Sequence, residues 1–342
     1  MNKIKHIAID ITYKCNFRCL HCYNYSGEHN DRLELTDNEI IHLNEELINN
    51  ETESICLCGG EPMLRQNIVY KVCKYTKGTN TKISTVSNGY LIDENVVKNF
   101  NKYGLSNIQL SLDGATASKH DWLRNKEGSF VTTIKALQLL HEYDINTSIA
   151  FCPTKRNIDE LGSAIDLTYD LGVSLFRIQP AMKIGRAIKN LDDYFLDNLN
   201  YMKVKYIINQ KRNEYQNKNF SIDWGDPLEH LHFSCQAKGY DLLDIAISGY
   251  GDILLSNFIP VSFGNIKKRS LNEYLNANIL SLWNSPIIRN IVGRLNSVED
   301  LSIFERLFPE LDKGGTIDLD MLGNDYNEKS QLLMERLEVQ GG

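Results

Sequence analysis

Short runs of apolar and β-branched residues alternate with helical patterns from the N-terminus to about residue 185. This alternation is typical of βα units around a parallel sheet, and several runs are nearly continuous in apolar residues, as strands buried on both faces should be. Six strands are too few for a closed eight-stranded barrel, so we expect an open, curved partial barrel with its active residues at the carboxyl ends of the strands. The predicted strands are His6 to Thr12, Ser54 to Gly60, Lys82 to Asn88, Asn107 to Asp113, Asn146 to Pro153 and Ser174 to Pro180.

The pattern changes after Arg186. A long polar helix is predicted from about Leu191 to Asn217, and a short segment rich in His and aromatic residues follows it. Two runs, Leu242 to Ser248 and Asp252 to Asn257, predict a β-hairpin. A helical pair comes next, and the acidic last segment is expected to be irregular. The expected fold is therefore α/β: a partial (β/α)6 barrel at residues 1–188, a linker at 189–234, and a small α+β extension with a tail at 235–342.

Composition and charge exclude some classes of function. The formal net charge is −7, so no overall basic field exists and nucleic acid is not an expected partner. No stretch approaches the roughly 20 apolar residues of a membrane helix, so we expect a cytoplasmic protein without a membrane partner. Three of the eight cysteines fall within the short segment Cys15 to Cys22, which indicates metal chemistry in a reducing compartment rather than a disulfide scaffold.

The segment with most chemical information is Cys15-Asn-Phe-Arg-Cys19-Leu-His-Cys22, in the loop directly after the first predicted strand. Thiolates are the ligands that iron–sulfur clusters prefer, and three of them can hold three irons of a cubane while the fourth iron stays open for a small chelating molecule. The alternative is a structural zinc site. It fits poorly, because zinc normally takes four protein ligands in spaced pairs.

This spacing after the first strand resembles the radical S-adenosylmethionine (SAM) superfamily, and further motifs follow at successive strand ends. They are Gly59-Gly60-Glu61-Pro62, Ser87-Asn88-Gly89, Ser111-Leu112-Asp113-Gly114, and Arg124 in a following helix. The resemblance implies a partial barrel of the radical SAM type, one [4Fe–4S] cluster on Cys15, Cys19 and Cys22, and reductive cleavage of SAM. It also implies that SAM is contacted by His21, Tyr23, Gly59, Gly60, Glu61, Ser87, Asn88, Ser111, Asp113 and Arg124.

The C-terminal half resembles the SPASM or twitch extension found in many radical SAM enzymes that modify peptides. Gln179 to Ala187, with Gly185-Arg186, and the predicted hairpin carry this resemblance. The sequence departs from it because the hairpin has Ser256 where a cysteine is expected and no cysteine follows Cys235. We therefore expect one cluster per chain and a degenerate extension that serves as a substrate lid or docking surface.

Without an auxiliary cluster to take up an electron, we expect a reaction that quenches the substrate radical. An example is epimerisation, in which a thiol returns a hydrogen atom. Cys235 is the candidate donor and Cys152 the second choice, although a lone cysteine is more often a buried hydrophobic residue. Cys56, Cys58 and Cys73 are interpreted as packing residues. A segment with Trp224, His230 and His232 is interpreted as a polar surface loop.

Three functional hypotheses remain open. The first is a radical SAM enzyme that forms a 5′-deoxyadenosyl radical, abstracts a substrate hydrogen, and epimerises or crosslinks a ribosomally made precursor peptide, which can add a strand to an open sheet edge. The second acts on a small molecule such as a sugar, nucleoside or cofactor precursor. The third is a non-catalytic protein that binds the cluster or SAM. The resemblance also implies a one-electron donor, flavodoxin or ferredoxin.

Overall fold

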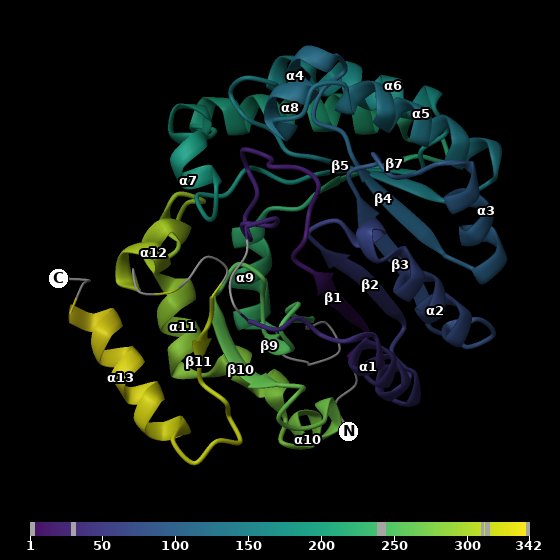
Figure 1. Ribbon diagram of the computed structural model, residues 1–342. Helices are drawn as coiled ribbons and strands as arrows, with labels where there is room; N and C mark the ends of the chain where they lie inside the picture. Colours follow the sequence, from purple (N-terminus) through teal and green to yellow (C-terminus); the bar gives the residue numbers. More distant parts are fainter. Residues whose placement is uncertain (1–3, 29–31, 238–243, 309–310, 312–314, 340–342) are drawn as a thin grey trace.

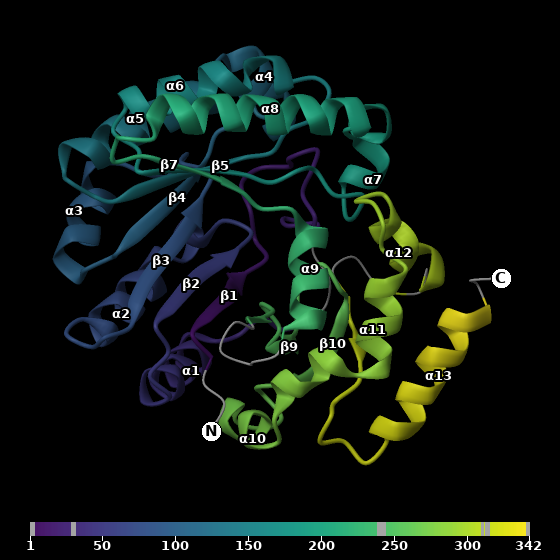
Figure 2. The same ribbon diagram turned by 180° about the vertical axis from the view of Figure 1, so that it is seen from behind.

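The computed structural model describes residues 4–28, 32–237, 244–308, 311 and 315–339. All of its strands join one sheet in the order β11-β10-β9-β8-β1-β2-β3-β4-β5-β6-β7. Figure 1 shows the strands from β1 to β5 fanning around an open, curved barrel, with helices on the outer side. The view from behind shows the same arrangement (Figure 2). None of the helices in the described part of the chain is long and apolar enough to cross a membrane.

The six predicted parallel strands are confirmed, and five of them end one or two residues before the predicted point. Their carboxyl ends all lie at one edge of the barrel, because each strand pairs in parallel with the next. They are β1 (His6–Thr12), β2 (Ser54–Gly59), β3 (Lys82–Ser87), β4 (Asn107–Ser111), β5 (Thr147–Phe151) and β6 (Leu175–Ile178).

Helices cover the convex face of these strands and bury their apolar side chains. In β1, Ile7, Ile9 and Ile11 are buried in the main core, whereas the alternate residues Asp10 and Thr12 point to the concave side. Thr36 and Glu39 form a capping box at the start of the first helix. The outer helices are α1 (Asp37–Asn49), α2 (Gln66–Thr76), α3 (Glu94–Tyr103), α4 (Ala117–Arg124), α5 (Ser129–Glu142) and α6 (Leu161–Asp170).

The segment after β6 adds a strand that the sequence did not indicate. A short helix α7 (Ala187–Asn190) precedes α8 (Asn198–Tyr215), which begins later than predicted because Asp197 caps it. Strand β7 (Ser221–Trp224) then pairs in parallel with β6. The predicted polar loop is wrong: Trp224 ends this strand, and both His230 and His232 lie in α9 (Pro227–Gln236). Asp226 at the N-cap and Pro227 at the first position start that helix.

The C-terminal part continues the same sheet from the other side of β1. Strand β8 (Ile245–Ile247) pairs in parallel with β1 and forms the predicted hairpin with β9 (Asp252–Leu254), while Leu242 and Leu243 lie outside the described residues. β10 (Val261–Asn265) and β11 (Ile317–Asp318) complete the sheet. One sheet runs through all three predicted parts, so the strand order does not mark a border between them. The predicted domain boundaries at residues 188 and 234 stay a prediction.

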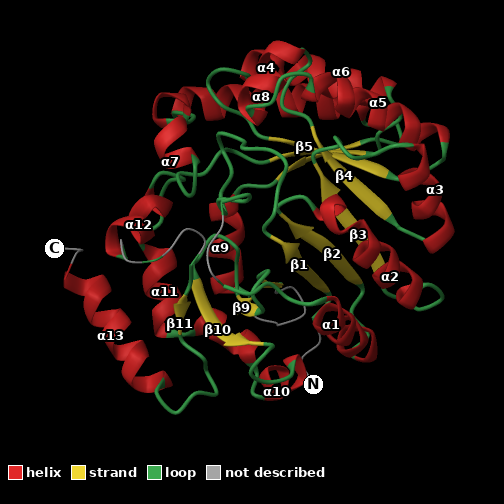
Figure 3. Ribbon diagram, in the orientation of Figure 1, coloured by secondary structure: helices red, strands yellow, loops and turns green. Residues whose placement is uncertain are grey.

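Helices of the C-terminal part close the gap in the ring, and Figure 3 shows α9 and α11 between the barrel strands and the outermost helix α13. The predicted helical pair is confirmed and is split by a short 3-10 turn. The expectation of an irregular last segment is wrong at its end, where a helix of 14 residues forms. The elements are α10 (Leu271–Asn276), 3-10 helix η5 (Ile279–Asn284), α11 (Pro286–Gly293), α12 (Ile303–Leu307) and α13 (Tyr326–Val339).

Candidate active site

The three cysteines of the predicted cluster loop lie in the segment that directly follows β1, and all three are free thiols. Burial is the main cause that raises the pKa of Cys15 to about 12, and the charges of Cys19 and Cys22 contribute in the same direction. The three thiols are thus within electrostatic reach of one another. Metal binding at this loop would displace their protons, as at other thiolate sites.

This donor set fits a cubane cluster. Among the residues that the structure describes, no three His, Cys, Asp or Glu side chains converge as the ligands of a single metal ion would. In a [4Fe–4S] cluster each thiolate binds a different iron, so the sulfurs stay apart and one iron keeps an open position. The three cysteines of the loop supply these three thiolates. Arg124 Nη1 lies 3.9 Å from Cys19 Sγ, and its positive charge favours the thiolate form of Cys19.

Gly59 and Gly60 let the cluster loop cross the end of β2 at backbone contact distance. A β-carbon on Gly59 would lie 2.2 Å from the Thr12 carbonyl oxygen, and one on Gly60 would lie 2.2 Å from that of Lys14. The N–H groups of Gly60 and Glu61 donate to these two carbonyls at 2.7 and 2.9 Å. Only glycine permits this approach. The two glycines therefore position the loop, and their predicted contact with SAM stays a prediction.

Glu61 joins the end of β2 to the end of β3. Its Oε1 accepts hydrogen bonds from Ser87 Oγ at 2.9 Å and the Met63 N–H at 3.1 Å, and its Oε2 accepts one from the Asn88 N–H at 2.8 Å. Burial raises the pKa of the Glu61 carboxyl, and these hydrogen bonds act in the opposite direction. Asn88 Nδ2 in turn donates to Asn16 Oδ1 of the cluster loop at 2.8 Å. The structure thus brings Glu61, Ser87 and Asn88 together beside that loop.

Arg124 and Asp113 form a buried ion pair beside Cys19. Arg124 Nε donates to Asp113 Oδ2 at 2.6 Å, while Asp113 Oδ1 accepts from the Cys152 N–H at 2.8 Å. Burial alone would raise the pKa of Asp113, but Arg124, the two neighbouring histidines and the Cys152 N–H together outweigh it, and the pKa is lowered. The predicted pairing of Arg124 with the SAM carboxylate stays a prediction, because in this structure Asp113 is its partner. The two residues lie together at the ends of β4 and α4.

The remaining predicted SAM contacts lie around the same loop. His21 is enclosed, and burial lowers its pKa to about 4, so the ring is neutral at pH 7; its Nδ1 has no hydrogen-bond partner among the described residues. Tyr23 packs edge-on against Phe258, with ring centroids 6.4 Å apart. Ser111 ends β4 and is half-buried. Tyr23 therefore faces the C-terminal part of the chain as well as the cluster loop.

Gly185 and Arg186 clamp the cluster loop from the end of β6. Arg186 donates from its N–H to the Cys22 carbonyl at 2.9 Å, from Nε to the Cys19 carbonyl at 3.0 Å and from Nη1 to the Ser26 carbonyl at 2.9 Å. The side chain is buried and also pairs with Glu28 at 3.1 Å. We singled these residues out only through the family resemblance. No local pattern indicates that an arginine at position 186 meets a loop at position 19.

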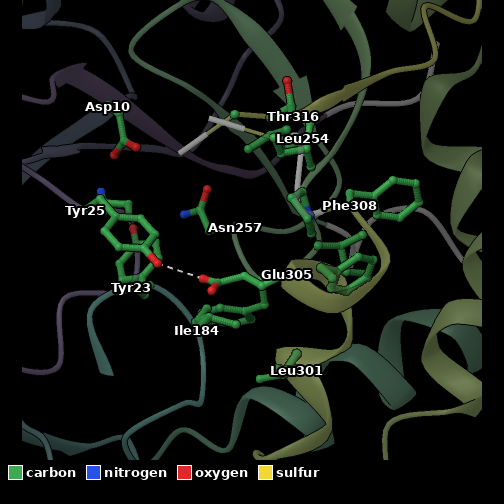
Figure 4. Close-up of a pocket in the computed structure, with 18 of the residues that line it drawn as sticks. Asp10, Tyr23, Tyr25, Ile184, Leu254, Asn257, Leu301, Glu305, Phe308 and Thr316 are labelled. Atoms are coloured by element: carbon green, nitrogen blue, oxygen red, sulfur yellow. Dashed lines mark hydrogen bonds between the residues drawn. The ribbon is translucent and has the colours of Figure 1, made fainter. Parts of the chain in front are cut away.

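A cavity of about 320 Å³ opens between the cluster loop and the C-terminal part (Figure 4). Its walls are mostly apolar and aromatic, and two acidic side chains, Asp10 and Glu305, are the charged groups among the described lining residues. Glu305 Oε1 accepts a hydrogen bond from the Tyr25 hydroxyl at 2.8 Å. The lining comes from β1, the cluster loop, the turn after β6, the stretch from the end of β9 to β10, and residues within 301–308, 311, 315 and 316.

Asp10 stands out in this cavity because its side chain is only 4% exposed and its Oδ1 has no hydrogen-bond partner among the described residues. Burial raises the pKa of the carboxyl to about 7, and the Tyr13 hydroxyl opposes this by hydrogen bonding. Our sequence reading missed Asp10 as a site residue. A charged residue that interrupts the apolar run of β1 was the available signal.

Comparison with known proteins identifies the domain that contains the cluster loop. Residues 9–168 match the Radical SAM superfamily, and this range contains the cluster loop and the carboxyl ends of β1 to β5. Residues 9–168 are a radical SAM domain. Enzymes of this superfamily use a [4Fe–4S] cluster and SAM, and these are the cofactors of this enzyme.

Two curated relatives match more than four fifths of this chain. The chain is 25% identical over 302 residues to an AdoMet-dependent heme synthase of Methanosarcina barkeri, covering 83% of this chain and 86% of the relative. It is 24% identical over 291 residues to the antilisterial bacteriocin subtilosin biosynthesis protein AlbA of Bacillus subtilis, covering 84% of this chain and 61% of the relative. The chain spans about half the length of several other curated relatives that it matches.

Solved radical SAM structures share the fold. SuiB of Streptococcus suis, solved with its precursor peptide SuiA, superposes with a TM-score of 0.66 at 18% identity, and the match covers 92% of this chain and 75% of SuiB. At this identity the likeness concerns the fold. The match extends well past residue 168, so the C-terminal part of this enzyme shares the arrangement as well as the radical SAM domain.

When bound, the cluster of the radical SAM domain supplies the electron that cleaves SAM into methionine and a 5′-deoxyadenosyl radical. The chain itself supplies the loop that holds the cluster cysteines, the Arg186 clamp, and the ion pair of Arg124 and Asp113 next to Cys19. A mostly apolar cavity beside this loop is suited to a carbon radical, because its walls offer little room for water and stray hydrogen donors.

The other cysteines occupy three different surroundings. Cys73 is buried in α2, as predicted. The interpretation of Cys56 and Cys58 as packing residues is wrong, because they lie on the concave side of β2 with their sulfurs 3.3 Å apart, and Cys56 lines a second cavity together with Arg177. Strand alternation put both on one face, but only the barrel shows that this face is the inner one. Cys235 in α9 lines a separate hollow beside α11 that none of the predicted SAM contacts lines.

We expect Asp10→Asn to stabilise the cluster-free protein at pH 8. The unfolded chain releases the Asp10 proton near pH 3.8 and the folded chain near pH 7, so stability falls as the pH rises between these values and the full penalty applies above them. At about 1.4 kcal/mol per pKa unit the gain is on the order of 4 kcal/mol. Urea unfolding of both proteins at pH 5 and pH 8 measures it. An equal gain at both pH values would show that the charge of Asp10 is not the cause.

Proposed function

We propose that this radical SAM enzyme modifies a ribosomally made precursor peptide. In this proposal the 5′-deoxyadenosyl radical abstracts a hydrogen atom from one residue of the peptide, and an epimer or a crosslink results. The SAM contacts are the residues predicted from sequence, with Glu61, Ser87, Asn88 and Arg124 around the cluster loop. One cluster per chain and an external one-electron donor, flavodoxin or ferredoxin, are part of the proposal.

The observation that carries this proposal is the size and chemistry of the cavity. Ligand pockets usually enclose about 300 to 1,000 Å³, and this one, at about 320 Å³, is at the small end. A single amino-acid side chain fits such a volume better than a tetrapyrrole does. Two sheet edges, at β7 and β11, offer places where an extended peptide can add a strand.

The second candidate is a small-molecule substrate, and the similarity to a heme synthase favours it. Heme carries carboxylate groups, which proteins commonly bind with arginine, lysine or backbone N–H groups. The described lining of the cavity contains none of the three basic residue types and two carboxylates instead. This charge pattern favours the peptide hypothesis over an anionic cofactor precursor. The third hypothesis, a protein that binds the cluster or SAM without catalysis, makes no use of the cavity.

The C-terminal part is proposed to act as the substrate lid. Residues within 254–260 and 301–308, together with 311, 315 and 316, supply the cavity wall opposite β1 and the cluster loop. Tyr25 and Glu305 connect the two sides through their hydrogen bond. A degenerate SPASM or twitch extension with this placement contributes to substrate binding although it lacks the cysteines for a cluster of its own.

The test uses anaerobically reconstituted enzyme, SAM, dithionite, and short peptides encoded beside the gene. We expect 5′-deoxyadenosine formation to increase when a peptide is present, together with a mass change in that peptide. A loss of 2 Da indicates a crosslink, and incorporation of one deuterium from D₂O indicates epimerisation. If instead only small molecules such as porphyrins increase turnover, or none is modified despite SAM cleavage, the peptide proposal fails.

If the reaction is an epimerisation, a thiol must return a hydrogen atom to the substrate radical. The two candidate donors, Cys152 and Cys235, lie in different places, so their substitution should have different effects. Cys152 directly follows β5, and the charges of Asp113, Arg124 and Cys19 act on it, whereas Cys235 lines the separate hollow. Burial raises the pKa of the Cys152 thiol well above its usual range, which keeps the hydrogen on sulfur. We expect Cys152→Ala to lose deuterium incorporation by at least about tenfold and Cys235→Ala to stay within about twofold of wild type. The opposite ranking would restore Cys235 as the donor.

A further inference from the structure

We propose that the cavity beside the cluster loop is a subsite for a cationic side chain, a lysine ammonium or an arginine guanidinium, with Asp10 as its counter-ion. The inference rests on the proposed function, because it names the class of peptide residue that enters the site. It is carried by an unpartnered, buried carboxylate oxygen in a cavity with aromatic walls.

Asp10 is placed for this role by the strand that carries it. β1 lies inside the sheet between β8 and β2, Asp10 pairs with Cys58 of β2, and its side chain points to the concave face. The carboxyl is 4% exposed and its Oδ1 lacks a hydrogen-bond partner among the described residues. A buried acceptor without a partner is costly, and the usual reason for its presence is a ligand that completes it.

Among the residues that the structure describes, the groups that act on Asp10 do not supply a positive charge. Tyr13 faces it from the following loop, Tyr23 from the cluster loop, and Cys56 and Cys58 from β2. Arg32 lies over the Tyr250 ring and pairs with Asp252 at 2.7 Å. The cation that Asp10 would pair with is therefore expected to come from the substrate.

The aromatic walls suit the same ligand. Tyr13, Tyr23, Tyr25 and Phe258 line the cavity, and a cation over an aromatic face gains additional attraction when it is desolvated. The long aliphatic stem of lysine or arginine matches the apolar remainder of the lining. Glu305 lies on the opposite side of the cavity, is exposed and accepts from the Tyr25 hydroxyl, so among the described lining residues Asp10 is the carboxylate with a buried, unpartnered oxygen (Figure 4).

Binding of a cation to Asp10 also predicts a pH dependence. The carboxyl of the ligand-free protein releases its proton near pH 7, and only the ionised form attracts a cation. Affinity for a lysine side chain should therefore increase as the pH rises from 6 to 8. Affinity for a neutral side chain of the same length should not.

The experiment measures binding of two matched probes, Nα-acetyl-lysine methylamide and Nα-acetyl-norleucine methylamide, to the reconstituted enzyme with SAM at pH 8. Calorimetry or ligand-observed NMR gives the dissociation constants. We expect the lysine probe to bind at least about tenfold more tightly, and the difference to disappear in Asp10→Asn. The control is Glu305→Gln, which removes the other carboxylate of the same cavity and should keep most of the preference.

Equal binding of the two probes to wild type, or loss of the preference in Glu305→Gln but not in Asp10→Asn, would overturn the assignment. The two proposals fail separately. If the lysine probe binds through Asp10 but no peptide is modified, the subsite stands and the peptide function fails. If peptides are modified with no preference for a basic residue and Asp10→Asn leaves their binding unchanged, the function stands and the subsite fails.

Discussion

Replacing Cys15 by alanine should leave a protein that folds but neither retains a [4Fe–4S] cluster nor cleaves SAM. Each cluster thiolate holds one iron, and a cubane with two protein ligands on a surface loop is readily lost. We expect 5′-deoxyadenosine formation to fall by at least about a thousandfold, because no electron reaches SAM without the cluster. Wild type should contain about four irons per chain, measured by iron and sulfide analysis after anaerobic reconstitution.

Cys73→Ala is the matched control, because it removes a thiol from the α2 helix outside the cluster loop. It should keep iron content and SAM cleavage close to wild type. Retention of SAM cleavage in Cys15→Ala would refute the assignment of the cluster loop. Clearly more than four irons in wild type would show that the C-terminal part holds a second cluster.

Gly185→Ala should release the cluster loop from its clamp. A β-carbon at position 185 would lie 2.4 Å from both the Cys22 and the Tyr23 carbonyl oxygens, and φ is +62°, where residues other than glycine are disfavoured. The conformation alone costs about 1–2 kcal/mol, and the overlap forces the loop away from Arg186. We expect cluster content to fall severalfold and SAM cleavage by about a hundredfold, measured by the 400 nm absorbance and by 5′-deoxyadenosine.

Gly293→Ala provides the comparison, since a β-carbon there meets no atom within 4 Å. Gly293 ends α11, where alanine favours the helix, so this variant should be as stable as wild type or slightly more stable. Arg186→Ala should resemble Gly185→Ala, since it removes two side-chain hydrogen bonds to the cluster loop. If Gly185→Ala retained a full cluster, the clamp would not be needed to position the cysteines.

Local patterns determined the barrel and the cluster loop. Apolar runs of strand length between amphipathic segments fixed β1 to β6 almost to the residue, because strand burial and helix periodicity are properties of neighbouring residues. The spacing of Cys15, Cys19 and Cys22 was informative for the same reason: the ligands are a few residues apart. Glu61, Ser87 and Arg124 were implied by the family resemblance, and the rule that carboxyl ends of parallel strands meet at one edge explains why Glu61 and Ser87 lie close together.

The tertiary structure alone decided which residues surround the substrate cavity. Asp10, Tyr23, Phe258 and Glu305 are up to 295 positions apart, and no pattern within a segment records that they share a wall. Only the tertiary structure shows that Arg186 contacts the cluster loop and that β7 and β8 lie at the two sides of the barrel strands. It also shows that Cys152 and Cys235 lie in different places. Sequence periodicity specifies which face of an element is apolar, whereas the pairing of distant elements depends on contacts that form only when the whole sheet assembles.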